Sequence, residues 1–253
     1  MFGHNHKYYL YAFNKEGLPI RSNKINSRKF NLNHNYFENI DTHEKAYWLG
    51  FIYADGYLTN AQNSKKFGVA LSKKDIHHLK KLNNCLDSNY PIHTYTQKNG
   101  CGFKEDNEYC RLLISSDKIY DDLIKHGVYE HKTNILTKPN IKEEFYPSFI
   151  LGYFDGDGSI FLNQGKYPFY AINIVGTNDI LTFIHNYFQS KQITNKNINI
   201  EKRQDNQIVS YMRYGGNKLV SKILDDLYQY ADSNLPLDRK RELYLKCKNR
   251  IFS

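Results

Sequence analysis

The chain contains two apolar, aromatic-rich segments with nearly the same pattern. Residues 46–56 read AYWLGFIYADG, and residues 148–158 read SFILGYFDGDG. Each apolar run is typical of a buried helix. Each run ends on an acidic residue followed by glycine, Asp55–Gly56 in the first copy and Asp157–Gly158 in the second. We therefore predict two buried helices with a carboxylate at each C-terminus, and we expect both glycines to adopt the left-handed conformation that commonly ends a helix.

Small residues are spaced four apart in both segments. Gly50 and Ala54 form such a pair in the first segment, and Gly152 and Gly156 form the pair in the second. Each helix therefore has small residues along one face. Glycine inside a helix costs about 1 kcal/mol relative to alanine, so it needs a packing reason, and small residues let two helix backbones approach closely. We predict that the two helices pack along these residues, which would leave two carboxylates that repel each other unless a cation joins them.

Alternating apolar and polar residues predict strands that follow the two helices. The predicted strands cover residues 92–98, 109–114, 159–163, 170–175, 197–203 and 209–214. Further segments repeat as well, because a strand passes into a helix near residues 69–76 and 173–180, and again near 114–120 and 214–220. We predict an α+β fold of two halves related by a pseudo-two-fold axis, residues 41–140 and 141–253, each with the element order αββαββα and an antiparallel sheet.

The predicted strand 197–203 has one apolar and one polar face. A polar face of an antiparallel sheet can enter a major groove and read base edges, although a merely solvated face has the same pattern. Two related sheets beside paired carboxylates favour DNA contact over simple solvation. The predicted DNA-contacting residues on these strands are Asn197, Asn199, Glu201, Arg203 and Arg213.

The first 40 residues lie outside the repeat and are rich in basic and aromatic side chains. We interpret them as a basic N-terminal arm, with Arg28 and Lys29 among its predicted contacts to DNA phosphates. A terminal tail without contacts is an equally good interpretation of residues 1–7. The arm thus extends the expected DNA contact beyond the two halves.

Composition narrows the class of protein. The 253 residues have a formal net charge of +9, which fits a polyanionic partner, although AT-rich coding would also enrich the chain in lysine. The four cysteines show no C-x-x-C spacing, so neither a zinc site nor a disulfide framework follows. The sequence has neither a stretch typical of a membrane span nor a signal peptide, so we expect no membrane partner and a cytoplasmic or nucleoid-associated protein, with an organelle left open.

The doubled motif is similar to that of a known family. Residues 48–56 and 150–158 resemble the two signature helices of a single-chain LAGLIDADG homing endonuclease, and the resemblance covers most of residues 41–253. It implies that Asp55 and Asp157 bind the metal, together with backbone near Ala54 and Gly156. The motif's earlier acidic position holds Asp155 in only the second copy, so we do not count it as catalytic.

The resemblance also implies a lysine near each metal site, which would polarise the attacking water or offset charge in the transition state. Lys132 and Lys240 occupy equivalent places near the end of each repeat, and they are the candidates for this role. In the family the two sheets form a saddle over the duplex, so we expect the same DNA-binding saddle here.

The implied function is site-specific hydrolysis of double-stranded DNA by a monomer. The resemblance implies Mg²⁺ as the cofactor, with Ca²⁺ expected to bind without supporting cleavage. It also implies cleavage across the minor groove that leaves 3′ overhangs, and a biological role in intron or intein mobility. The alternative is a non-cleaving nucleic-acid-binding protein of the same fold, either an RNA maturase or a DNA-binding regulator. The sequence lacks the terminal residues of a splicing element, so we expect a free-standing enzyme.

Overall fold

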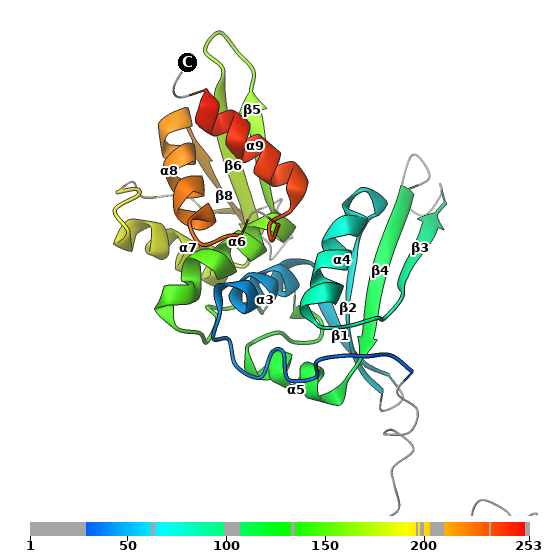
Figure 1. Cartoon of the computed structure of the whole chain (residues 1–253). Helices are drawn as coiled ribbons and strands as arrows, with labels where there is room; N and C mark the ends of the chain where they lie inside the picture. The colour runs from blue at the N-terminus through cyan, green and yellow to red at the C-terminus, as the bar shows by residue number, and fades with distance from the viewer. Residues whose placement is uncertain are drawn as a thin grey trace, which may run out of the picture. The chain divides into compact units, whose positions relative to one another are not determined.

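The structure is a computed structural model of the chain. It describes residues 29–61, 64–98, 107–132, 135–195, 197, 200–202, 210–232 and 234–250. Leu32–Ser253 form one compact unit, and Met1–Asn31 form another. All of the described helices and strands lie in the larger unit (Figure 1).

The first half of the larger unit begins with a motif helix and contains one sheet. Its elements are α3 (His43–Asp55), β1 (Gly56–Ala61), β2 (Ser64–Ser72), the 3-10 turn η1 (Lys73–Asp75), α4 (Ile76–Cys85), β3 (Ile92–Gln97), β4 (Asn107–Ser115) and α5 (Asp117–Lys125). The strands form an antiparallel sheet in the order β1-β2-β4-β3. This half has the predicted order αββαββα.

The second half repeats the same order and adds a helix. Its elements are the 3-10 turn η3 (Glu143–Phe145), α6 (Tyr146–Asp157), β5 (Gly158–Asn163), β6 (Phe169–Gly176), α7 (Asn178–Ser190), β7 (Glu201–Lys202), β8 (Ser210–Gly215), α8 (Asn217–Tyr228) and α9 (Asp238–Asn249). The sheet order β5-β6-β8-β7 corresponds to that of the first half, and it is again antiparallel. The predicted α+β fold of two related halves is therefore confirmed.

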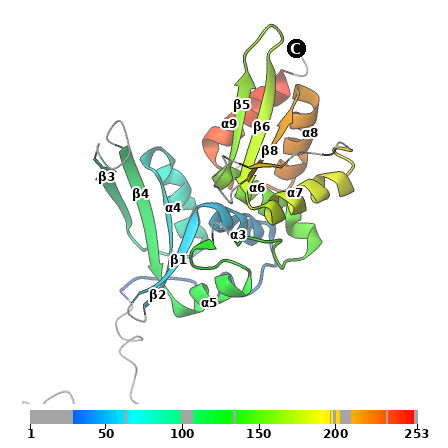
Figure 2. The same cartoon turned by 180° about the vertical axis from the view of Figure 1, so that it is seen from behind.

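Each sheet has one face packed under helices and one face away from them. In β6, Ile172 and Ile174 are fully buried, whereas the intervening Asn173 is only partly buried. The packed face of the first sheet contacts α4 and α5, and that of the second contacts α7, α8 and α9. Figures 1 and 2 show α4 on one side of the first sheet and α8 and α9 on one side of the second.

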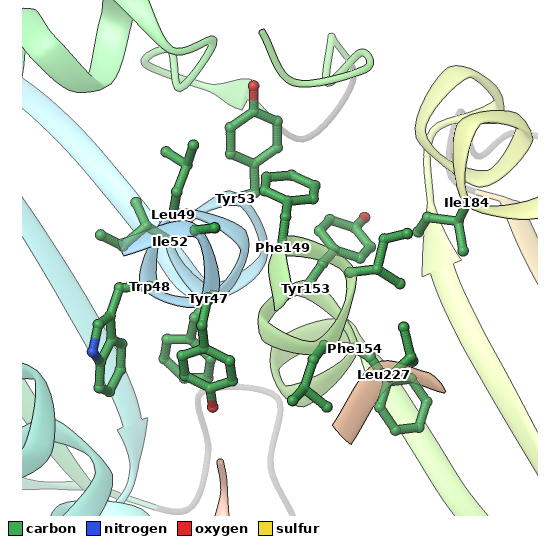
Figure 3. Packing of buried hydrophobic residues seen from close by; sticks show 14 of the residues in the cluster. Tyr47, Trp48, Leu49, Ile52, Tyr53, Phe149, Tyr153, Phe154, Ile184 and Leu227 are labelled. Carbon is green, nitrogen blue, oxygen red and sulfur yellow. The ribbon is translucent and has the colours of Figure 1, made fainter. Parts of the chain in front are cut away.

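The two motif helices lie side by side at the centre of the core. Tyr47, Trp48 and Tyr53 of α3 are buried, as are Phe149 and Tyr153 of α6 (Figure 3). The rings of Tyr53 and Phe149 meet edge to face, with their centroids 4.9 Å apart. Although both helices are apolar, none of the described helices is long and apolar enough to cross a membrane.

The structure differs from the strand predicted at residues 197–203. The strand β7 comprises only Glu201–Lys202, which pair with Ser210 and Tyr211 of β8. Asn197 and Ile200 lie outside any strand, and residues 198, 199 and 203–209 lie outside the described part of the chain. Ile200 is partly buried against the core without belonging to the ladder. The alternating pattern therefore predicted a strand at two described positions, Asn197 and Ile200, that do not belong to one.

Residues 32–40 belong to the folded unit and not to an arm. Tyr36, Phe37 and Ile40 are buried in the core, and the Asn33 amide donates to the Leu86 carbonyl at 2.8 Å. The predicted arm was therefore too long at its C-terminal end, because the aromatic and apolar residues of this segment are core material. Residues 1–28 lie outside the described part of the chain.

Candidate functional site

The backbones of α3 and α6 touch where both helices carry glycine. A Cβ atom built on Gly50 would lie 1.9 Å from the Phe149 carbonyl oxygen, and one built on Gly152 would lie 1.9 Å from that of Tyr47. Farther along, a Cβ on Gly156 would lie 2.3 Å from the Cβ of Ala54. At Gly50 and Gly152 any side chain larger than hydrogen would thus meet backbone atoms of the facing helix. This contact, made by the four small residues predicted for it, continues to the C-terminal turns of both helices.

The close contact brings the two terminal carboxylates together. Asp55 ends α3 and Asp157 ends α6, and both side chains are partly buried. Burial and the charge of Asp157 raise the pKa of Asp55 to about 6. Burial also raises the pKa of Asp157 above its ordinary value, against the opposing charges of Lys132 and Lys240. The two carboxylates therefore hold negative charge at an energetic cost in this site.

The glycines after these carboxylates are extended and not left-handed. Gly56 has φ −77° and ψ 158°, and Gly158 has φ −100° and ψ 166°, so the predicted left-handed caps are wrong. Glycine is needed at these positions for space. A Cβ on Gly56 would lie 2.6 Å from the Ile52 carbonyl oxygen, and one on Gly158 would lie 2.1 Å from the Phe154 ring. The chain therefore turns directly from each helix into the first strand of its sheet.

Lys132 reaches the end of α3 from the segment that follows α5. Its Nζ donates to the Ala54 carbonyl oxygen at 2.7 Å, and only 8% of the residue is exposed. A cation at the C-terminus of a helix interacts favourably with the helix dipole. Burial lowers the pKa of Lys132, whereas the charges of Asp157 and Asp55 act in the opposite direction. Lys132 thus brings positive charge beside both carboxylates, close to where the sequence predicted it.

Lys240 reaches the end of α6 from the first turn of α9. Its Nζ donates to three carbonyl oxygens, those of Phe154 at 2.5 Å, Asp155 at 2.7 Å and Gly158 at 2.6 Å. Lys240 is 1% exposed, and burial lowers its pKa to about 8. The two lysines therefore approach corresponding helix ends, but they make different sets of hydrogen bonds.

Asp155 connects the two halves within the core. Its Oδ2 accepts hydrogen bonds from the Tyr47 hydroxyl at 2.6 Å and from the Leu237 amide at 2.8 Å. His78 Nε2 lies 3.1 Å from the same hydroxyl. In the first half the corresponding position is Tyr53, whose hydroxyl donates to the His126 carbonyl oxygen at 2.6 Å. Asp155 is buried, and its Oδ2 is directed at Tyr47 and Leu237 within the core.

The donor set fits a hard divalent cation that completes its coordination with water and substrate. Among the described residues no group of three or more histidine, cysteine, aspartate or glutamate side chains could hold a metal ion. Mg²⁺ commonly takes one or two carboxylates and fills its remaining positions with water and substrate phosphate. Burial and the neighbouring charge of Asp157 both disfavour the ionised form of Asp55, and a cation between the two carboxylates would offset their repulsion. Asp55 and Asp157 are the residues that would hold such an ion.

The predicted DNA-contacting residues are only partly described. Asn197, Glu201 and Arg213 are exposed, and Arg213 on β8 lies over the Phe161 ring at 4.9 Å from its centroid. Lys29 is also exposed, but it belongs to the smaller unit. Arg28, Asn199 and Arg203 lie outside the described residues. The structure therefore supports an exposed position for only part of this set.

The first sheet has a polar and aromatic face that the sequence analysis did not single out. Arg111 on β4 points away from the buried Cys110 and Leu112, and its guanidinium lies 5.9 Å from the centroid of the Tyr95 ring. The Tyr95 ring in turn stacks on Tyr109 with centroids 5.6 Å apart. The alternation of residues 109–114, which predicted the strand, also predicts this exposed face. Arginine and tyrosine side chains on such a face are suited to contact with nucleic acid.

Comparisons with known proteins support the same fold. No family model and no curated protein matches the chain. The solved structure of the LAGLIDADG homing endonuclease I-GzeII in complex with a DNA target covers 80% of this chain and 89% of its own, with a TM-score of 0.55 and 12% identity. The I-LtrWI LAGLIDADG homing endonuclease bound to target DNA covers 87% of this chain and 92% of its own, with a TM-score of 0.52 and 12% identity.

A third solved structure, meganuclease I-SmaMI bound to uncleaveable DNA, covers 80% of this chain and 88% of its own, with a TM-score of 0.51 and 14% identity. Identities this low establish the fold alone. The paired motif helices, the two antiparallel sheets and these similarities lead to one conclusion. The chain has the fold of the single-chain LAGLIDADG homing endonucleases, with both motif helices in one polypeptide.

Proposed function

We propose that this protein is a site-specific, metal-dependent endonuclease of double-stranded DNA. The observation that carries the proposal is the carboxylate pair, Asp55 and Asp157, at the tips of two helices in backbone contact. Two acids at a pseudo-two-fold axis can serve both strands of a duplex from one place. Buried like charges are unfavourable for folding, so their presence here fits a role in chemistry better than a role in packing.

The proposed role of the two carboxylates is to hold Mg²⁺. When bound, the ion would lower the pKa of the attacking water and stabilise the leaving 3′ oxygen. Lys132 and Lys240 add positive charge beside the carboxylates. The tight contact between Gly156 and Ala54 fixes the two helix ends, so the carboxylates keep their relative position when DNA binds.

The proposed DNA-binding surface is the exposed face of each sheet. Arg111 on the first sheet and Arg213 on the second are exposed, and each lies over an aromatic ring. The formal net charge of +9 favours association with a polyanion. The similar structures are described as bound to DNA, which supports the same partner here. We propose that the protein works as a monomer and that the sheets form a saddle over the duplex.

We further propose that the protein cleaves across the minor groove and leaves 3′ overhangs, and that it has a role in intron homing. The direct experiment is to incubate the purified protein with a plasmid library of candidate sites in Mg²⁺ or in Ca²⁺. We expect linear plasmid with 3′ overhangs in Mg²⁺, and binding without cleavage in Ca²⁺. Specific binding without any cutting in Mg²⁺ or Mn²⁺ would instead favour the non-cleaving nucleic-acid-binding protein.

A further inference from the structure

The start of α9 is held by side chains from the first half of the protein. Lys81 of α4 makes an ion pair with Asp238 at 2.7 Å and donates to the Pro236 carbonyl oxygen at 2.9 Å. Arg239 pairs with the Asp75 carboxylate, just before α4, at 3.2 Å. These contacts join positions that are 155 to 164 residues apart in the sequence. We call Asp75, Lys81, Asp238 and Arg239 the α4–α9 clamp.

The clamp has a charge pattern that fits one alignment of the two helices. The first half supplies an anion and a cation, Asp75 and Lys81, and α9 supplies the matching cation and anion. Only 15% of the Asp75 side chain and 22% of the Lys81 side chain are exposed. Fully exposed ion pairs contribute little, but a charge that is largely removed from water needs its partner. A shifted or rotated α9 would leave both of these charges unpaired.

The core fixes the backbone of the same segment. The Leu237 amide donates to Asp155 Oδ2 at 2.8 Å, and the Tyr47 hydroxyl donates to the same oxygen at 2.6 Å. Leu237 and Asp155 are both buried. The four consecutive residues 236–239 therefore each make a polar contact with another element of the fold.

The clamp connects elements that pack on different sheets. In the first half α4 packs on β2 and β4, and in the second half α9 packs on β5. Figures 1 and 2 show the start of α9 beside α4. The halves also meet where α3 and α6 touch along their small residues, and two bodies that meet along one line can rotate about it. The clamp is a connection through other elements, and it opposes such a rotation.

We propose that the α4–α9 clamp fixes the angle between the two sheets, with Lys81 and Asp238 as positioning residues for the DNA-binding surface. The effect on DNA rests on the proposed function, whereas the effect on the sheets does not. A duplex contacts both sheets at once only when their angle matches its path. An angle that is set before binding lowers the free-energy cost of binding.

The first experiment measures the arrangement of the sheets without DNA. Spin labels are introduced as noncanonical amino acids at two exposed positions, Thr94 on β3 and Lys166 between β5 and β6, and pulsed electron paramagnetic resonance measures the distances between them. We expect one narrow distance distribution for the parent. Lys81→Glu and Asp238→Lys should each broaden or shift it, because like charges then face each other, and the two substitutions combined should restore it. An unchanged distribution in both single variants would overturn the proposal.

The second experiment measures affinity for a duplex that is selected by binding from a random library in Ca²⁺. Lys81→Glu and Asp238→Lys should each weaken binding about tenfold, and their combination should bind within about threefold of the parent. The combination has the net charge of the parent, and Lys80→Glu, at the adjacent exposed position, controls for a general change of charge. A loss of affinity that the combination does not recover, or an equal loss in Lys80→Glu, would overturn the role of the clamp in DNA binding.

Failure of this inference is distinguishable from failure of the nuclease function. A parent protein that binds DNA without cutting it contradicts the nuclease function, and both experiments still test the clamp. For a parent that binds no DNA, the distance measurement decides alone. Asp238→Asn removes the ion pair without placing like charges together, so it replaces a charge-reversal variant that does not fold. It should broaden the distance distribution as well, and a distribution like that of the parent would contradict the clamp.

Discussion

Gly152 of α6 lies directly against the carbonyl group of Tyr47 in α3. A Cβ atom at Gly152 would be 1.9 Å from that carbonyl oxygen, and backbone cannot move aside as a flexible side chain can. The contact explains why a residue that costs about 1 kcal/mol in a helix interior is found there. It also sets the distance between the helix ends that carry the carboxylates.

We predict that Gly152→Ala destabilises the protein although alanine is the better helix former. Overpacking costs about 1–3 kcal/mol, and here it would force two helix backbones apart, so we expect a net loss of about 2 kcal/mol or more in the free energy of unfolding. Urea unfolding measures this loss. Gly165→Ala is the matched control, because a Cβ at Gly165 meets nothing within 4 Å. Equal stability of the two variants would show that the helices are not in backbone contact.

A second prediction concerns acid sensitivity and His78. This side chain is buried beside Tyr47, and burial lowers its pKa from 6.5 to about 3. Below pH 6.5 the His78 side chain becomes protonated in the unfolded chain but stays neutral in the folded protein. The free energy of unfolding therefore falls as the pH falls. The contribution of His78 is therefore fully present above pH 6.5, and about 2 kcal/mol of it should be lost by pH 5.

The measurement is urea unfolding between pH 5 and pH 7.5 for the parent and His78→Gln. The glutamine variant cannot titrate in this range, so its stability should depend less steeply on pH. His77→Gln, at the adjacent exposed position in the same helix, is the control and should follow the parent. Parallel pH profiles for the parent and His78→Gln would contradict a neutral, buried His78.

A third prediction concerns the N-terminal residues. Residues 1–28 contain five basic residues and one acidic residue. The basic residues are Lys7, Lys15, Arg21, Lys24 and Arg28, and the acidic residue is Glu16. Removing one ionic interaction with a DNA phosphate should reduce the slope of log affinity against log salt by roughly 0.9. Deleting residues 1–28 should therefore weaken DNA binding and flatten this slope without changing the preferred site. Full affinity after the deletion would show that the segment does not bind phosphates, and a changed site preference would show that it reads bases.

The structure also fixes where such a deletion must stop. Phe37 is fully buried and Tyr36 nearly so, so removing residues up to 40 should unfold the protein as well as weaken DNA binding. Circular dichroism of the two truncated proteins distinguishes these effects. A folded protein that starts at residue 41 would contradict the position of these residues in the core.

The sequence predicted the features that depend on local pattern. The doubled apolar segments predicted the helices that end at Asp55 and Asp157, and period-two alternation predicted strands such as β6 within about two residues of their observed ends. Repetition across the two halves made both predictions stronger, because the same pattern had to arise twice. The four-residue spacing of the small residues likewise predicted the contact between the helices.

Other features depend on distant parts of the chain, and local pattern could not predict them. The hydrogen bond from Tyr47 to Asp155 joins positions in different halves. The three carbonyl contacts of Lys240 depend on how α9 packs after the second sheet, and the contact of Lys132 with the Ala54 carbonyl depends on the path of the segment after α5. The conformation of Gly56 could not be predicted from the local sequence either. An Asp-Gly pair at the end of a helix is compatible with an extended glycine and with a left-handed one.

The carboxylates of Asp55 and Asp157 serve catalysis and not folding in the function proposed for this protein. The most direct measurement is the cleavage rate of Asp55→Asn and Asp157→Asn on the recovered site in Mg²⁺, with DNA affinity and thermal unfolding measured on the same samples. Asp179→Asn, at an exposed position in the first turn of α7, controls for loss of a carboxylate. We predict that both site variants fold, bind DNA and make no double-strand break, and that Mg²⁺ raises the unfolding temperature of the parent more than theirs. A folded variant that still cuts both strands at the parent's rate would contradict the catalytic role of these carboxylates.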